Sequence, residues 1–92
     1  MNNQDLKELK KLVDAAMKDT DDRLRSYPDY GPYLNAKEQL QFITLKIDNV
    51  KLINQGDKDS INIGIMAVKS LEDTEPEYAR LLMKISTRFK RL

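Results

Sequence analysis

Apolar residues recur every three or four positions along most of the chain, which is the spacing of one face of an α-helix. The first such run extends from about Gln4 to Ser26 and is polar on its opposite face. Acids and bases balance along that polar face, as expected for a solvated surface. The pattern predicts a long amphipathic helix. Its apolar positions are Leu6, Leu9, Leu12, Val13, Ala16, Met17, Thr20 and Leu24, and Tyr27 continues the series.

A second helix is predicted from about Pro32 to Asn54, with Gly56 as its terminator. It carries two apolar stripes, whereas a helix packed on one side needs only one. We therefore expect it to be covered from more than one side and to be the central element. The polar residues within it must find partners or reach solvent. The first stripe is Tyr33, Ala36, Leu40, Ile43, Ile47 and Val50, the second is Phe42, Leu45 and Leu52, and the polar residues are Lys37, Gln39 and Gln41.

A β-hairpin competes with this interpretation. The segments 43–47 and 61–65 both alternate between apolar and other residues, and the turn-forming run NQGDKD lies between them. Against the hairpin, residues 35–41 favour a helix that runs without a breaker into Phe42. A two-stranded hairpin is also marginal without further strands. The helix is the favoured prediction, and the hairpin is the alternative.

Two shorter helices are predicted in the second half of the chain. The third runs from about Ser60 to Leu71, and its core face is formed by Ile61, Ile65, Val68 and Leu71. Gly64 lowers the helix propensity of this segment by about 1 kcal/mol relative to alanine, which indicates close approach of another helix or of a partner backbone. Asp57, Asp59 or Ser60 is available as the cap of this helix.

The fourth helix begins at the segment LEDTEPEY. Thr74 and Glu77 have the spacing of a capping box, and Pro76 suits a first turn. Its apolar side is formed by Tyr78, Leu81, Leu82, Ile85, Phe89 and Leu92. Together the patterns predict an all-α fold: a single domain over residues 1–92, built as a compact bundle of about four helices with the second helix central.

Composition narrows the possible functions. A chain of 92 residues can build one core but not a deep catalytic cavity as well. It has no cysteine and no histidine, so it lacks thiolate chemistry, the commonest general base and the commonest metal ligand. Its three glycines are isolated, so no phosphate-binding loop is present. We therefore predict a protein that is not an enzyme and that uses neither a metal nor a cofactor.

Net charge and the N-terminal segment limit the expected partners and location of the protein. The formal net charge is +1, which provides no general attraction to nucleic acid or to an anionic membrane. The N-terminal segment has no continuous apolar core, so it does not resemble a signal peptide. No stretch approaches the roughly 18 apolar residues that span a bilayer. We expect a cytoplasmic protein that binds neither nucleic acid nor a membrane.

The turn at residues 27–33 has the composition of a binding site. Pro28 ends the first helix, Pro32 starts the second, and the turn between them carries Tyr27, Tyr30 and Tyr33. One interpretation is that all three tyrosines pin the helix corner to the core. The other is that at least one, Tyr30 first, faces outward as an anchor, because tyrosine is enriched in interfaces. Both interpretations can hold for different tyrosines.

The acids are also unevenly distributed. Residues 56–77 carry six acids against two lysines, whereas residues 78–92 carry five bases and no acid. Acids at a helix start and bases at a helix end complement the helix dipole, which explains part of this pattern. The surplus of acid in the segment from Glu72 to Glu77 is available to a basic partner.

Two blocks of the chain resemble a known family. They are RLRSYPDYGPYLNAKEQLQFI (23–43) and GIMAVKSLEDTEPEYARLL (64–82), which together cover 40 of the 92 positions. The matching features are a YPxY turn, an A-x-x-QLQ-x-I helix, a G-x-x-AVK segment and a last helix that begins with PE. They resemble the small immunity proteins that are paired with type VI secretion toxins of the NAD(P)⁺ glycohydrolase kind.

The resemblance implies an immunity protein that binds its cognate toxin domain in the cytoplasm, blocks the toxin's active site and has no enzymatic activity. A toxin cleft built for an anionic dinucleotide would be basic, so the acidic segment and the tyrosine turn are the expected contacts. In an up-and-down bundle the loops before the second and fourth helices lie at the same end. The predicted toxin-binding residues are Tyr27, Asp29, Tyr30, Tyr33, Glu72, Asp73, Glu75 and Glu77.

Two other functions compete with this one. A homodimeric helical adaptor would use the second apolar stripe of the second helix for self-association. A nucleic-acid binder would use the bases between Arg80 and Arg91, although Phe89 is the one aromatic residue among them.

Overall fold

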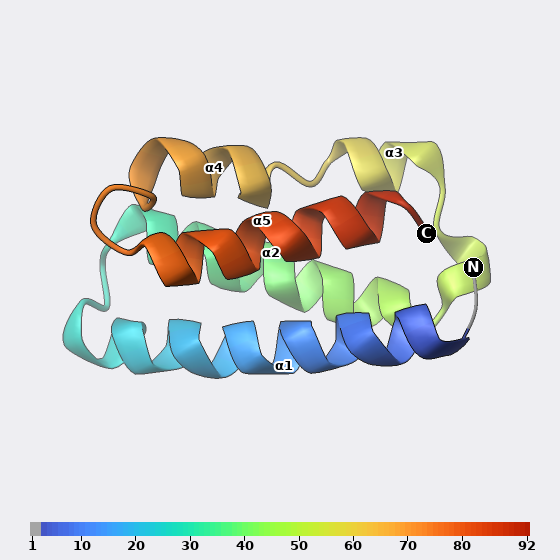
Figure 1. Cartoon of the computed structure of the whole chain (residues 1–92), viewed down its shortest axis with the longest axis horizontal. Helices are drawn as coiled ribbons and strands as arrows, with labels where there is room; N and C mark the ends of the chain where they lie inside the picture. Colours follow the sequence, from blue (N-terminus) through green and yellow to red (C-terminus); the bar gives the residue numbers. More distant parts are fainter. Residues whose placement is uncertain (1–2) are drawn as a thin grey trace.

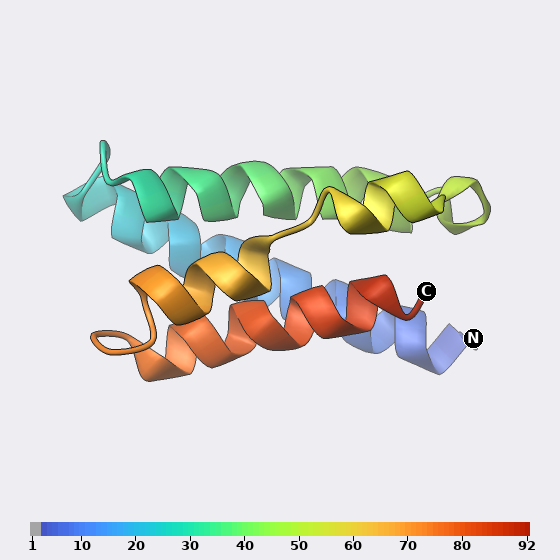
Figure 2. The ribbon, with the colours of Figure 1, turned by 90° about the horizontal axis from the view of Figure 1, so that it is seen from above.

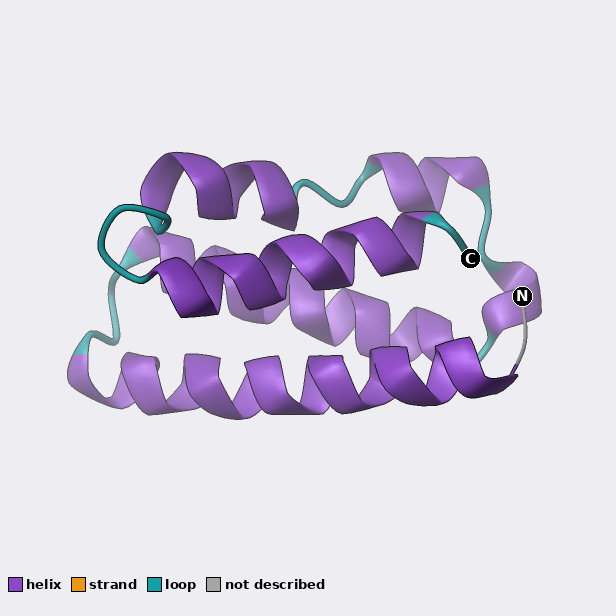
Figure 3. Cartoon of the chain, viewed as in Figure 1, coloured by secondary structure: helices purple, strands orange, loops and turns teal. Residues whose placement is uncertain are grey.

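The computed structural model describes residues 3–92, and all regular structure in that range is helical (Figures 1 and 3). The elements are α1 (Asn3–Ser26), α2 (Gly31–Ile47), the short 3₁₀-helix η1 (Val50–Leu52), α3 (Gln55–Asp59), α4 (Ile63–Ser70) and α5 (Pro76–Lys90). The prediction of an all-α fold is confirmed, and the β-hairpin alternative is wrong. None of the helices in this range is both long and apolar enough to cross a membrane.

The four longer helices form a ring of antiparallel neighbours. α1 packs against α2 and α5, and α4 packs against the same two helices from the other side. Figures 1 and 2 show that the chain direction alternates from each of these helices to the next. The α1–α2 turn and the α4–α5 loop therefore lie at the same end of the bundle, on the left in Figure 1. This confirms the predicted placement of the two loops.

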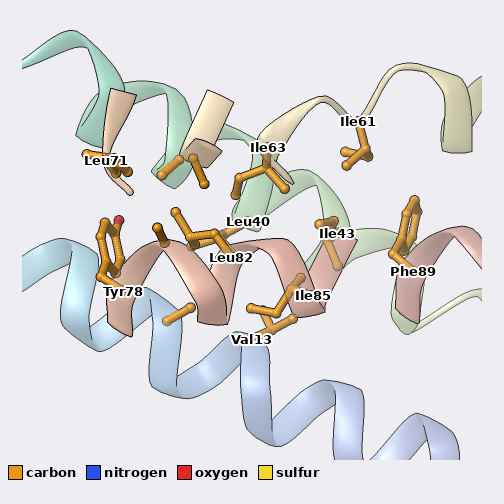
Figure 4. Close-up of a cluster of buried hydrophobic side chains, with 14 of the residues drawn as sticks. Val13, Leu40, Ile43, Ile61, Ile63, Leu71, Tyr78, Leu82, Ile85 and Phe89 are labelled. Carbon is orange, nitrogen blue, oxygen red and sulfur yellow. The ribbon is translucent and has the colours of Figure 1, made fainter. Parts of the chain in front are cut away.

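The core lies along the axis of this ring. Figure 4 shows Val13, Leu40, Ile63 and Leu82, one from each of the four longer helices, directed into the same interior. Leu40, Ile63 and Leu82 are fully buried. The polar side chain of Gln39 is buried beside them and finds the partners it needs. It donates to Asn35 Oδ1 at 2.6 Å and accepts from the backbone N–H of Asn62 at 2.9 Å.

The second helix is shorter than predicted. It ends at Ile47 rather than near Asn54. Asn54, the predicted last residue, is instead the N-cap of α3. The Asn54 side chain accepts from the backbone N–H of Asp57 at 2.8 Å, and the Asp57 carboxylate accepts from the backbone N–H of Asn54 at 3.1 Å. This reciprocal capping box begins α3. Gly56 consequently lies inside α3 and terminates nothing.

The second predicted apolar stripe is only partly packed against this chain, and its last member, Leu52, lies in η1 rather than in α2. Leu45 is 69% exposed and Leu52 is 71% exposed, while Phe42 is partly buried. α2 does contact helices on two sides, α1 and α4, but it does so through its first stripe and its polar residues. The expectation that both stripes are covered is therefore wrong for Leu45 and Leu52.

The third predicted helix, α4, is shorter than predicted and buries a different face from the one that the sequence pattern indicated. It begins at Ile63, and its buried residues are Ile63 and Ala67, whereas Ile65 and Val68 are exposed. The expected caps Asp57 and Asp59 belong to α3 instead. Gly64 sets the orientation, because a Cβ at this position would lie 3.1 Å from Ser86 Cβ of α5. The predicted close approach of another helix at Gly64 is confirmed.

The last helix begins one residue after Glu75, which is its N-cap residue without a side-chain cap. The capping box predicted from Thr74 and Glu77 is wrong. The buried face is as expected and includes Tyr78, Leu82, Ile85 and Phe89. The Glu75 side chain leaves the helix end and turns toward the α1–α2 turn, where the candidate site lies.

Candidate functional site

Glu75 joins the α4–α5 loop to the tyrosine turn. Its Oε2 accepts a hydrogen bond from the Tyr33 hydroxyl at 2.5 Å, and its Oε1 accepts one from Arg23 Nε at the same distance. The Glu75 side chain is 22% exposed, so this ion pair is partly shielded from water. One carboxylate thus holds together the end of α1, the start of α2 and the loop before α5.

Further contacts hold Arg23, the ion-pair partner of Glu75, in place. The Arg23 guanidinium lies 3.9 Å from the centroid of the Tyr78 ring, within the range of a cation–π interaction. The Tyr78 hydroxyl is 2.6 Å from Thr20 Oγ1, and Thr20 donates its own hydrogen to the Ala16 carbonyl at 2.7 Å. Tyr78 is therefore the donor to Thr20. This chain of contacts explains why a threonine occupies a buried position in the apolar stripe of α1.

The protonation states in this network are well defined. Burial, followed by the hydrogen bond to the Glu75 carboxylate, raises the pKa of Tyr33 to about 12. Burial also raises the pKa of Tyr78. Burial opposes the charge on Arg23, but the hydrogen bond and attraction from Glu75 outweigh it and raise the pKa of Arg23. At neutral pH both phenols keep their protons and the guanidinium keeps its charge.

The three tyrosines of the turn divide into two roles. Tyr33 is 7% exposed and belongs to the core, whereas Tyr27 is 63% exposed and Tyr30 is 42% exposed. The ring of Tyr30 meets that of Tyr33 edge to face, with centroids 4.7 Å apart, and the ring of Tyr27 lies 6.4 Å from that of Tyr33. Both interpretations of the turn therefore hold, because Tyr33 pins the corner while Tyr27 and Tyr30 face outward.

A pocket opens where these rings meet the α4–α5 loop. It has a volume of about 170 Å³ and is lined by Tyr27, Tyr30, Tyr33, Thr74 and Glu75. The structure thus brings four of the predicted site residues into one small cavity. Thr74 was not among the predicted site residues, because sequence alone gave it a capping role.

The other four predicted site residues do not line this pocket; they are exposed acids in or beside the segments that form it. Asp29 is exposed within the turn, Glu72 and Asp73 are exposed in the loop, and Glu77 is exposed in the first turn of α5. Glu75 differs from them, because both of its oxygens are already engaged by this chain. Hereafter, the tyrosine–acid surface denotes residues 27–33 together with residues 72–77.

Comparison with known proteins identifies the family. The Tsi6 family model matches residues 8–91. A curated relative, the immune protein Tsi6 of Pseudomonas aeruginosa, is 34% identical over 71 residues, which cover 76% of this chain and 73% of the relative. The chain belongs to the Tsi6 family. This confirms the resemblance to type VI secretion immunity proteins that the two sequence blocks indicated.

Solved structures agree with this assignment. The structure of Tsi6 from Pseudomonas aeruginosa superposes with a TM-score of 0.77 at 28% identity, covering 86% of this chain and 91% of that one. A chain from the structure of Tse6 in complex with Tsi6 superposes with a TM-score of 0.79 at 30% identity, covering 88% and 85%. The bundle described above is thus the Tsi6 fold, and a Tsi6 protein has been seen bound to another protein.

Among residues 3–92, no group of three or more histidine, cysteine, aspartate or glutamate side chains is arranged to hold a metal ion. What this Tsi6-family chain presents at the candidate site is a pair of exposed aromatic rings beside a small pocket, with exposed carboxylates in the same two segments. Exposed aromatic rings and carboxylates are suited to recognising a basic protein surface.

Proposed function

We propose that this Tsi6-family protein is an immunity protein that binds a cognate toxin domain and blocks the toxin's active site. The curated relative is named an immune protein, and the structure of Tse6 in complex with Tsi6 is among the solved structures that this chain resembles. Both facts support a function carried out by protein–protein binding. The proposed contact region is the tyrosine–acid surface.

One observation supports this choice of surface above the others. The Glu75 carboxylate ties the tyrosine turn to the acidic loop through Tyr33 and Arg23, so two stretches far apart in sequence form one surface. A surface that is already ordered loses less conformational entropy on binding. Exposed tyrosines on such a surface are suitable anchors, because aromatic residues contribute much of the energy at interface centres.

The proposed mechanism is occlusion of a basic cleft. The sequence resemblance points to toxins of the NAD(P)⁺ glycohydrolase kind, whose substrate carries phosphate charge. Asp29, Glu72, Asp73 and Glu77 would take the place of that negative charge at the mouth of the cleft. The immunity protein itself needs no catalytic group for this task. The purified protein is expected to leave NAD⁺ unchanged, and measurable consumption of NAD⁺ would contradict the proposal.

Co-expression with a candidate toxin encoded by the adjacent open reading frame tests the function, and calorimetry tests the surface. Cells that make both proteins are expected to grow, while cells that make only the toxin are not. The Tyr30→Ala variant is expected to bind the toxin domain more weakly by about 2 kcal/mol or more, because it removes an exposed anchor. The control is Leu45→Ala, which truncates another exposed side chain about 22 Å away along α2.

The outcome that overturns the surface is clear. If Tyr30→Ala and the charge reversals of Glu72 and Asp73 stay folded, bind and protect like the wild type, the toxin binds elsewhere. Circular dichroism of each variant separates a lost contact from a lost fold.

A homodimeric adaptor is the second candidate, and the exposure of Leu45 and Leu52 favours it. Self-association through these leucines would bury them against a second copy. Sedimentation of the purified protein tests this directly. A concentration-dependent dimer that Leu45→Asp disrupts would support the adaptor, and a monomer at all concentrations would exclude it.

A further inference from the structure

The pocket in the tyrosine–acid surface has the chemistry of a cation-binding site. Its wall consists of the rings of Tyr27, Tyr30 and Tyr33, whose faces carry partial negative charge. A cation placed over such a face within about 6 Å of the ring centroid is attracted to it. The remaining lining residues are Thr74 and Glu75.

Glu75 retains acceptor capacity after its internal bonds are made. A carboxylate offers about four lone-pair positions on its two oxygens. Arg23 and Tyr33 use one position on each oxygen. Each oxygen therefore keeps a further lone pair, the Glu75 side chain is 22% exposed, and Glu75 is one of the residues that line the pocket. Two neighbouring acceptors match the paired N–H groups of a guanidinium.

The surroundings of the pocket are acidic. Residues 27–33 and 72–77 contain no lysine or arginine, whereas they contain five carboxylates: Asp29, Glu72, Asp73, Glu75 and Glu77. Arg23, the cation in contact with this cluster, is occupied by Glu75 and by the Tyr78 ring. The field at the pocket mouth thus attracts positive charge from outside the chain.

We propose that this pocket receives the side chain of an arginine of the toxin, with its guanidinium stacked on the ring of Tyr30 and hydrogen-bonded to Glu75. Arginine fits better than lysine, because its guanidinium is planar, weakly hydrated and able to make two parallel hydrogen bonds. This inference rests on the proposed function, and it names the group that the tyrosine–acid surface recognises.

Double-mutant cycles on the complex test it. Each surface arginine of the toxin domain is changed to glutamine in turn. Calorimetry then measures the Kd of each toxin variant for the wild-type immunity protein and for its Tyr30→Leu variant. One arginine is expected to couple to Tyr30 by about fivefold to thirtyfold, the range of a desolvated cation–π contact. The Tyr30→Phe variant keeps the ring and is expected to retain that coupling.

Controls keep the outcomes distinct. Tyr27→Leu changes a second residue of the pocket wall and replaces Tyr30→Leu if that variant does not fold. Leu45→Ala lies outside the pocket, and its effect on Kd is expected to be independent of every arginine substitution in the toxin. If the toxin binds the wild type but no arginine couples to either tyrosine by more than about twofold, the arginine pocket is wrong while the proposed function stands. Coupling to a lysine instead would also overturn it. If the toxin does not bind the wild-type protein at all, the proposed function fails and this inference fails with it.

Discussion

At the scale of single residues, Glu75 is the side chain whose role differs most from the one its sequence position indicates. In the sequence it is one of several acids beside a proline, and an exposed binding role is the natural prediction. In the structure it accepts from Arg23, 52 residues away, and from Tyr33, 42 residues away. Partners at such separations leave no local pattern. The distribution of charge along the sequence therefore identified the acidic stretch but not which of its acids is hydrogen-bonded within the chain.

The Tyr33 hydroxyl makes stability depend on pH in the alkaline range. Its pKa is about 12 in the folded protein and near 10 in the unfolded chain. The folded state therefore holds a proton that the unfolded state releases, so stability falls as pH rises from about 10 toward 12. Urea unfolding at several pH values is expected to show this loss, and Tyr33→Phe is expected to reduce its slope. An equal slope in the variant would mean that other groups cause the loss.

Leu40 tests the core at the level of one side chain. It is fully buried among residues of all four longer helices. Leu40→Ala is expected to lower the free energy of unfolding by about 2–5 kcal/mol, through lost burial and the cavity left behind. Leu45→Ala is the matched control on the same helix and is expected to change stability by less than about 0.5 kcal/mol. Denaturant titration measures both, and similar values for the two variants would contradict the assigned orientation of α2.

At the scale of elements, periodicity predicted the helices well and their ends poorly. α1 and the buried face of α5 match the sequence pattern, because each presents one uninterrupted apolar stripe to the core. The region from Ile47 to Ile63 does not match the sequence pattern. Asn54 and Asp57 cap a short helix there, and this helix has no apolar stripe from which it could be predicted. The side-chain hydrogen bonds of this cap, rather than an apolar stripe, define where the helix begins there.

The contact between α4 and α5 depends on Gly64. A β-carbon at this position would lie 3.1 Å from Ser86 Cβ and 3.7 Å from the Met83 Cα, so a branched side chain has no space. Gly64→Val is expected to destabilise the protein by about 1–3 kcal/mol, as overpacking does. Gly31→Ala is the control, because a Cβ at Gly31 meets nothing within 4 Å. Thermal unfolding compares the two, and an unchanged melting temperature for Gly64→Val would show that the helices separate without cost.

At the scale of the whole molecule, the net charge of +1 conceals a separation of charge along the bundle. The α4–α5 loop, at the same end as the tyrosine turn, is acidic, while Arg88, Lys90 and Arg91 lie at the far end of α5. Both charge clusters are visible in the sequence itself. The predicted topology places the two loops at one end of the bundle. The hydrogen bonds of Glu75 show that these two loops form one surface.

This separation of charge predicts how the complex forms. Exposed charges at the rim of an interface act mainly on the rate of encounter, because they attract a complementary surface before contact and are only partly desolvated afterward. Changing both Glu72 and Asp73 to lysine is therefore expected to slow toxin association by about tenfold at low salt. The dissociation rate is expected to change less, and the dependence of association on ionic strength is expected to weaken.

The matched control alters charge by the same amount at the opposite end of the bundle. Asp48 and Asp59 are exposed carboxylates near the ends of α2 and α3, and changing both to lysine adds the same positive charge as the first pair of substitutions. Stopped-flow association at several salt concentrations compares the two variants with the wild type. If only the Glu72 and Asp73 variant slows, the toxin approaches the acidic end. If both variants slow equally, net charge rather than its placement governs encounter, and steering by the tyrosine–acid surface is wrong.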